Sequence, residues 1–556
     1  PMNIDISQIG YRWKGIYSAN LTYAENDVVY KDGGAYVIRS NAPVPFALGQ
    51  QDAVLKGQLL TGGLSAGGFG NMVLHTDGAT VEFRFQDTRA GTLATKLARS
   101  DHQASYYGSL QFGMTIMQDR SVRSWGRQAG GAAGCGTADI GRTVPNRVPF
   151  PPGTPHIVDI LIMWSDTFYL DASGTVWHSG QNGASIGGYG TTAAQGTPRK
   201  VNGNGDLGTD IKIVKLTGRI DSYDYRGAGF IDDAGRVYVT GNNTSSRMGL
   251  GATTADVNVP RLIPLTETVP MKDMFFGCTN NGATWLLSRT GQLYACGELN
   301  TSGRGNTNNV HELWMPWGEA NTVKEVVHST SNLHWIAGAQ YSRMTTVLLD
   351  NGDLYMWGDG AGQVGGGYGT GYSGELFTNN ALHPYKVNEG VVTASSINGG
   401  YHRTLCLMDD GGIQHSGSNG AFAPDNVTTW RTLDPTVFNN GTKLLTMGSL
   451  YQSQGMLLRS DGQLVLWGDG VSGRLGIGAD GDTIWTAGSI SYPQPAKLDK
   501  TIIDFMPLGD FQPDSSTSSV MMLTSDGGVY VTGSGYAGQN GDDDSEYSAV
   551  PRQITF

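Results

Sequence analysis

The sequence predicts an all-β chain, most of it a β-propeller of about eight four-stranded blades, preceded by a small three-stranded N-terminal module. A short turn-and-strand motif recurs at intervals of 51 to 65 residues, and glycine supplies 82 of the 556 residues. Apolar residues alternate on both sides of each turn. A period of this length is typical of solenoids and propellers. A lone four-stranded blade cannot cover both of its faces, so such blades are expected to pack around an axis.

Each copy of the motif has a turn glycine and a second glycine six residues later. The clearest copies are residues 351–358 (NGDLYMWG) and 461–468 (DGQLVLWG). In the first copy Arg120 replaces the turn glycine. The second glycines are Gly126, Gly180, Gly241, Gly297, Gly358, Gly417, Gly468 and Gly533.

Two positions beside the turn are aliphatic in all eight copies. Two residues after the turn glycine stand Val122, Val176, Val237, Leu293, Leu354, Ile413, Leu464 and Val529. Four residues before it stand Ile116, Leu170, Ile231, Leu287, Leu348, Leu407, Leu458 and Leu523. This alternation predicts a β-hairpin with one buried face. Asp-Gly and Asn-Gly pairs in the turns accept the positive φ of tight hairpins.

A proline follows most hairpins after a glycine-rich turn. Examples are Pro198, Pro384, Pro495 and Pro551. Proline lacks the N–H that a sheet ladder needs, so it fits the start of an edge strand. Each repeat therefore offers about four short strands, which is one blade.

The first part of the chain lacks this motif. Residues 1–40 form the predicted aromatic module, with Trp13, Tyr17, Tyr30 and Tyr36 at strand-like positions. These aromatics could stack on sugar rings, but a module of this size also needs aromatics as its core. Residues 41–104 are predicted to be a linker or attachment segment with a β-hairpin, and the propeller is placed at residues 105–556.

Composition excludes several function classes. Lys and Arg total 37 against 49 Asp and Glu, for a net charge of −12, which disfavours nucleic acid as a partner. No apolar stretch is long enough for a transmembrane helix. No catalytic or cofactor-binding signature is evident, so we expect neither enzymatic activity nor a cofactor. Acidic loop residues offer oxygen ligands for calcium, although solvated loop acids are the simpler interpretation; they are Asp480, Asp482, Asp542, Asp543 and Asp544.

The repeats resemble the regulator of chromosome condensation family. Its pattern is a glycine, a His, alternating apolar residues, Asp-Gly, an apolar residue, Tyr, Trp-Gly, then Gly-Gln-Leu-Gly and a late proline. Residues 399–407 (GGYHRTLCL) are the closest copy of its first part. The resemblance implies a propeller, usually of seven blades, against eight copies counted here. The ring is therefore expected to have eight blades or, alternatively, seven with one copy absorbed in closing the ring. The family's His is kept only at His402, and Ser165 and Arg226 stand at two of the equivalent positions.

Residues 11–39 resemble a small chitin-binding-type module that also occurs in phage tail and fibre proteins. Together with residues 41–104 they are similar to structural proteins of phages that infect cyanobacteria. This resemblance implies a non-enzymatic virion protein at the tail or capsid surface, with its N-terminal segment attached to other virion proteins.

The propeller is then expected to recognise a host-surface glycan or protein through its loops. Loops rich in Tyr, Gly, Ser and Asn are typical of adaptable binding surfaces. The candidate loop residues are Trp314, Trp317, Tyr368 and Tyr372. One alternative is a guanine-nucleotide exchange factor-like or other protein-interaction propeller. A second is a polysaccharide-degrading tailspike, which would need two positioned carboxylates. Self-association of the chain is left open.

Overall fold

The computed structural model divides the chain into two compact units, Pro1–Thr92 and Leu93–Phe556. It describes residues 12–16, 27–31, 34–37, 72–76, 81–85, 93–99, 112–127, 130–136, 141–163, 165–220, 226–276, 283–297, 310–314, 323–331, 343–359, 381–397, 403–417, 427–448, 453–468, 473, 475–478, 491–508, 519–535, 538, 540–541 and 546–556.

The first unit contains the three-stranded sheet that the sequence predicts. Its strands are β1 (Arg12–Ile16), β2 (Asp27–Lys31) and β3 (Gly34–Val37), with β1 and β2 parallel and β2 and β3 antiparallel. The predicted hairpin is also present, as β4 (Met72–Thr76) paired with β5 (Val81–Phe85). Strands β3 and β5 are in contact, so the hairpin belongs to the same compact unit as the sheet.

The second unit is a β-propeller, as the sequence predicts. Its described strands form eight four-stranded sheets that follow one another along the chain. The first four blades are β6 (Ala94–Leu97), β7 (Phe112–Met117), β8 (Val122–Arg127), β9 (Gly141–Arg147); β10 (Ile157–Met163), β11 (Asp166–Asp171), β12 (Val176–Gly180), β13 (Gln195–Lys200); β14 (Ile213–Ile220), β15 (Arg226–Asp232), β16 (Val237–Gly241), β17 (Val257–Leu262); and β18 (Met271–Phe276), β19 (Ala283–Ser288), β20 (Leu293–Gly297), β21 (Val310–Trp314).

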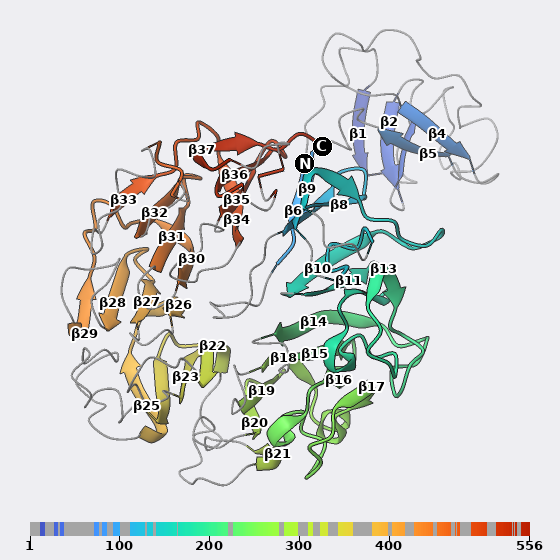
Figure 1. Cartoon of the computed structure of the whole chain (residues 1–556). Helices are drawn as coiled ribbons and strands as arrows, with labels where there is room; N and C mark the ends of the chain where they lie inside the picture. Colours follow the sequence, from blue (N-terminus) through green and yellow to red (C-terminus); the bar gives the residue numbers. More distant parts are fainter. Residues whose placement is uncertain are drawn as a thin grey trace. The chain divides into compact units, whose positions relative to one another are not determined.

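The other four blades are β22 (Val323–Ser331), β23 (Arg343–Leu349), β24 (Leu354–Asp359), β25 (Ala381–Asn388); β26 (Val391–Ile397), β27 (Arg403–Met408), β28 (Ile413–Gly417), β29 (Val427–Thr432); β30 (Gly441–Gly448), β31 (Ser453–Arg459), β32 (Leu464–Gly468), β33 (Ser491–Pro495); and β34 (Ile502–Leu508), β35 (Ser519–Thr524), β36 (Val529–Gly533), β37 (Ser548–Gln553). Figure 1 shows the strands of each blade side by side. The described residues include three short 3-10 helices. Helices η2 (Gly183–Ser185) and η3 (Thr244–Ser246) lie between the third and fourth strands of the second and third blades, and η4 (Pro264–Glu267) connects the third blade to the fourth.

The repeated hairpin forms the two middle strands of every blade. In all eight blades the two predicted aliphatic residues are directly opposite each other, and each is at most 6% exposed. The pairs are Ile116–Val122, Leu170–Val176, Ile231–Val237, Leu287–Leu293, Leu348–Leu354, Leu407–Ile413, Leu458–Leu464 and Leu523–Val529. The prediction of a buried hairpin face is therefore confirmed.

Apolar side chains between neighbouring blades make the core. Between the second and third blades, for example, Phe168 packs in one cluster with Leu216 and Phe230. Similar clusters join each following pair of blades up to the eighth. A further cluster joins the first blade to the second and to the eighth, and Ala94 N donates to Gly527 O at 2.7 Å across the last junction. The ring thus closes by side-to-side packing of complete blades.

The propeller begins earlier than the sequence indicated. The expected boundary at residue 105 is wrong, because β6 already forms the first strand of the first blade and the compact unit starts at Leu93. Strand β6 lies before the first hairpin and contains no glycine, so the motif could not place it.

The four predicted prolines lie in the outer strands of their blades, and each of these strands pairs with one neighbouring strand only. Pro198, Pro384 and Pro551 lie inside β13, β25 and β37, and Pro495 ends β33. The edge placement is therefore confirmed, although these prolines do not start their strands. A proline in an edge strand hinders pairing with another chain.

A polar side chain just before the second glycine links several blades to a loop of the preceding blade. The contacts are Ser179 Oγ to Ala132 O at 3.3 Å, Thr240 Oγ1 to Ile186 O at 2.5 Å, Cys296 Sγ to Arg247 O at 3.2 Å and Thr532 Oγ1 to Gly473 O at 2.9 Å. In the first and seventh blades the same position holds Trp125 and Trp467, which are buried.

Candidate interaction face

The first strand of each blade lies innermost, because these strands contact one another across blade junctions, as β10 does β14 and β14 does β18. All eight begin with the same irregularity, a register shift between their first and third residues. A bulge of this kind leaves one residue unpaired and redirects its side chain. In the second blade Ile157 is buried, Val158 is exposed, Asp159 is partly exposed and Ile160 is buried.

The second residues of these strands expose large aliphatic side chains. Val158, Val214, Val392 and Ile503 are 38%, 49%, 41% and 52% exposed. They are four of the seven large hydrophobic residues that are exposed among the residues with described burial. Folding does not require an aliphatic residue here, because Thr95, Lys272 and Thr442 occupy the same position in other blades.

The third residues of most of these strands carry charges, and three ion pairs join neighbouring blades. Lys96 Nζ lies 2.7 Å from Asp159 Oδ1, Lys215 Nζ 2.7 Å from Asp273 Oδ2, and Lys443 Nζ 2.6 Å from Asp504 Oδ1. We call the second and third residues whose burial is described the hub rim: Thr95, Lys96, Val158, Asp159, Val214, Lys215, Lys272, Asp273, Val392, Thr393, Thr442, Lys443, Ile503 and Asp504. Exposed ion pairs of this type add little stability, about 0–1 kcal/mol each.

The hairpin turns hold the rim in place from the neighbouring blade. Ile213 N donates to the turn glycine Gly174 O at 2.9 Å, and Ile502 N donates to Gly462 O at 2.9 Å. Equivalent bonds run from Met271 to Gly235, Val391 to Gly352, Gly441 to Gly411 and Ala94 to Gly527. Gly174 and Gly462 have φ of 87° and 82°, a conformation that favours glycine. The rim is thus a surface preformed by backbone hydrogen bonds.

Two basic side chains contact Asp159 on the rim. Arg99 Nε donates to its Oδ2 at 2.8 Å, in addition to the Lys96 contact. Burial by itself raises the pKa of Asp159, but the nearby charges of Arg99 and Lys96 together lower that pKa below its ordinary value of 3.8. The carboxylate is therefore ionised at neutral pH.

Asp159 gives the rim a defined pH dependence. Because its pKa is lower in the folded than in the unfolded protein, its stabilising contribution is complete above the unfolded value of about 3.9 and is lost as pH falls through the folded pKa. Thermal unfolding of the wild type and of Asp159→Asn should therefore differ most at neutral pH and converge in acid. An unchanged difference across the acid range would contradict this prediction.

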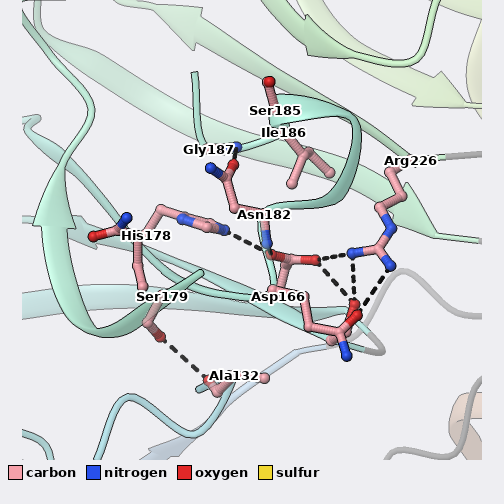
Figure 2. A network of polar contacts seen from close by, with 12 residues as sticks. Ala132, Asp166, His178, Ser179, Asn182, Ser185, Ile186, Gly187 and Arg226 are labelled. Atoms are coloured by element: carbon pink, nitrogen blue, oxygen red, sulfur yellow. Dashed lines mark hydrogen bonds and ion pairs between the residues drawn. The ribbon is translucent and has the colours of Figure 1, made fainter. Parts of the chain in front are cut away.

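A second polar cluster is buried in the second blade, at the end of the hairpin strands β11 and β12 that lies away from their turn (Figure 2). Asp166 accepts hydrogen bonds from Asn182 N at 2.7 Å, Arg226 Nη1 at 2.8 Å and Ser165 Oγ at 3.0 Å, and its Oδ1 lies 2.9 Å from His178 Nε2. The side chains of Asp166 and His178 are fully buried, and that of Arg226 is 1% exposed. A cluster closed to solvent cannot bind a substrate, so we assign it to joining the second and third blades.

Arg226 is the link across this junction. It starts β15 of the third blade and donates to Ser165 Oγ at 2.9 Å and to Gln181 Oε1 at 3.1 Å in the second blade. Ser165 and Arg226 occupy two of the positions where the resemblance places a His. The structure thus brings two of these equivalent positions into direct contact.

Most of the predicted site residues lie outside the described residues. These are Tyr17, Trp317, Tyr368, Tyr372, Asp480, Asp482, Asp542, Asp543 and Asp544. Trp314 is the last residue of β21. In the first unit Trp13 pairs with Val28, Tyr30 with Ala35 and Tyr36 with Val29. Tyr36 is therefore opposite the residue that precedes Tyr30, which assigns Tyr30 and Tyr36 to opposite faces of the sheet.

The described part of the chain gives two further results. It holds no group of three or more His, Cys, Asp or Glu side chains that could bind a metal ion. Nor does it have a helix with the length and hydropathy to span a membrane.

The hub rim was not found from the sequence. Its signal is a short pattern of an apolar residue, an exposed residue and a charged residue, as in Ile157-Val158-Asp159 and Ile502-Ile503-Asp504. This pattern lies 17 residues before the turn glycine in the second blade and 25 in the eighth. Aligning the chain on the turn glycines therefore does not align the rim.

Comparison with known proteins supports the repeat assignment. Residues 234–283 match the model of the Regulator of chromosome condensation (RCC1) repeat. The chain is 25% identical over 337 residues to the human E3 ubiquitin-protein ligase HERC2, a match that covers 58% of this chain but 6% of the ligase. It is 26% identical over 250 residues to the mitochondrial RCC1 domain-containing protein RUG3 of Arabidopsis thaliana, covering 44% of this chain and 52% of RUG3.

Solved structures with a similar fold include human WBSCR16, at 17% identity and a TM-score of 0.49, covering 69% of this chain and 96% of that one. Another is Prp20p of Saccharomyces cerevisiae, described with its binding to Gsp1p and histones. The match has 15% identity and a TM-score of 0.45, and it covers 82% of this chain and 88% of Prp20p. The chain spans only part of the curated relatives. The repeat match and the RCC1-domain relative show that this propeller is similar to proteins built from RCC1 repeats.

Proposed function

We propose that the propeller is a non-enzymatic protein-interaction module that binds its partner at the hub rim. The observation that carries this proposal is the recurrence of exposed Val158, Val214, Val392 and Ile503 at one structural position. Aliphatic side chains that are held exposed on a rigid surface gain free energy when a partner covers them.

The outer edges of the blades are poorly suited to binding a partner, so a face of the propeller is favoured as the binding surface. Prolines in the outer strands hinder the addition of a partner strand. The polar cluster around Asp166 is closed to solvent and joins the second and third blades. The rim combines exposed apolar groups with charged groups in a fixed arrangement, which is what a protein partner needs for affinity and specificity.

A photo-crosslinking residue tests the proposal. Placed at Val214 in the full chain, it should give a discrete crosslinked protein, and binding of that protein to the purified chain should then be measurable. The control position is Asn258, which is exposed in the outer strand β17. Equal labelling at both positions, or no reproducible partner at Val214, would contradict the proposed function.

The alternatives predict other outcomes. An exchange factor would accelerate nucleotide release from a small GTPase, and a tailspike would shorten host polysaccharide chains. If either activity is found with the purified chain, the module is not merely a binding surface. Rim substitutions would then show whether the rim takes part in that activity.

The narrower hypothesis of a phage virion protein stays a prediction. It rests on the sequence resemblance of residues 11–104 alone. Imaging of labelled particles and binding to host envelope glycans would test it.

A further inference from the structure

A proline-rich segment connects the first blade of the propeller to the second. It follows β9, precedes β10 and has the sequence PFPPGTP over residues 149–155. Its prolines are all exposed: Pro149, Pro151, Pro152 and Pro155. Phe150, which lies among them, is partly buried. The segment therefore presents proline rings, rather than its one aromatic side chain, to solvent.

The prolines give the backbone of this segment a defined shape. A proline holds its own φ at about −65° and keeps the residue before it extended. Residues 148–152 therefore favour the polyproline II conformation. Gly153, with a φ of 81°, then reverses the chain, and Thr154 N donates to Pro151 O at 3.2 Å, as in a type II turn.

Contacts with the second blade hold the segment in place. The ring of Phe150 packs edge-on against Tyr169 and Trp177, with ring centroids 5.1 Å and 6.3 Å apart. After the turn, His156 O accepts a hydrogen bond from Ala172 N at 2.9 Å. A polyproline II helix has about three residues per turn, so anchoring one side chain in three leaves the others facing outward. A segment fixed in this way loses little conformational entropy when a partner binds it.

We infer that residues 149–152 bind a groove of another protein that is lined by aromatic side chains and supplies hydrogen-bond donors. The proline rings offer flat apolar faces on which aromatic rings can stack. Among the described residues, none donates a hydrogen bond to the carbonyl oxygens of Pro149, Phe150 and Pro152. These oxygens can therefore accept from an indole N–H or a tyrosine hydroxyl of the partner. This is a second binding site, beyond the proposed function of the hub rim, and it includes no residue of the rim.

Addition of a partner β-strand fits this segment less well. A strand that joins a sheet edge exchanges N–H and C=O bonds along its length. Within residues 149–152 only Phe150 carries a backbone N–H, because proline has none. Stacking on the rings with donation to the carbonyl oxygens uses the groups that the segment does expose.

The inference is tested by probing a panel of purified SH3, WW and EVH1 domains, whose grooves are lined by aromatic residues, with the full chain. We expect at least one domain to bind the wild type and soluble poly-L-proline to compete for that binding. The double variant Pro149→Ala and Pro152→Ala should bind the same domain at least about tenfold more weakly. The substitutions remove ring methylenes from the contact and make the unbound backbone less restricted.

The matched control is Pro435→Ala, which changes an exposed proline in the connection between the sixth and seventh blades and should leave binding unchanged. Thermal unfolding of each variant shows whether the fold is retained, which is expected because these prolines are exposed. The inference is overturned if no domain of the panel binds the wild type, or if the bound domain binds the double variant as tightly. Crosslinking at Val214 tests the hub rim separately, so either site can fail without the other.

Discussion

Replacing Asp166 with Ala is expected to lower the free energy of unfolding by about 3–5 kcal/mol. The substitution leaves the guanidinium of Arg226 buried without its carboxylate, and it also removes the acceptor of Asn182 N. A buried charge without a counter-charge has lost its hydration, and no ion pair compensates for that loss. Thermal unfolding followed by far-UV circular dichroism measures the effect.

A double variant separates loss of the ion pair from loss of packing. Asp166→Ala combined with Arg226→Met removes both charges, so the double variant should be more stable than Asp166→Ala alone. The control is Asp206→Ala, whose partner Arg261 lies at 3.0 Å and which is exposed, so a change of about 0–1 kcal/mol is expected. If Asp166→Ala and Asp206→Ala had equal effects, the buried cluster would not join the blades.

This cluster also shows how far the sequence could lead. The resemblance singled out the positions of Ser165 and Arg226 as places where a His is expected. It did not show that Arg226 of the third blade would donate a hydrogen bond to Ser165, which occupies the equivalent position in the second blade. That contact depends on how the blades pack together, which a repeat period does not contain.

The hairpins were predictable for a physical reason. The turn glycine and the two aliphatic residues beside it lie within one short segment, so their spacing is fixed by the hairpin itself. Ile116 and Val122, or Leu523 and Val529, must face each other whatever the rest of the blade does. Local geometry therefore made all eight buried pairs visible in the sequence.

The hub rim depends on a connection of variable length and was therefore not visible. Between the innermost strand and the hairpin lies a loop, and Ile157 precedes Gly174 by 17 residues whereas Val323 precedes Gly352 by 29. Because the distance from the innermost strand to the hairpin varies, the motif did not locate β6, and the predicted start of the propeller fell after this strand. A surface built from one residue per blade becomes recognisable only when the blades are superimposed in space.

Replacing Trp467 with Ala is expected to lower the free energy of unfolding by about 3–5 kcal/mol. Its side chain is 1% exposed, and its ring packs on Phe438 with centroids 4.9 Å apart. Trp467 fills the place where Thr532 and Thr240 of other blades donate a hydrogen bond to the preceding blade. The cavity left by Ala would lie between the sixth and seventh blades, whose shared core contains Trp467.

The residue opposite Trp467 gives this prediction a sharper form. Gly455 pairs with Trp467, and a Cβ added to Gly455 would lie 2.1 Å from the nearest ring atoms. Gly455→Ala should therefore destabilise the wild type by about 1–3 kcal/mol. The same substitution in the Trp467→Ala background should cost much less, because the clashing ring is gone. Gly208→Ala, whose Cβ would meet only Ile211 at 3.7 Å, serves as the control. Additive effects of Gly455→Ala and Trp467→Ala would mean that glycine is required there for its backbone rather than to admit the indole ring.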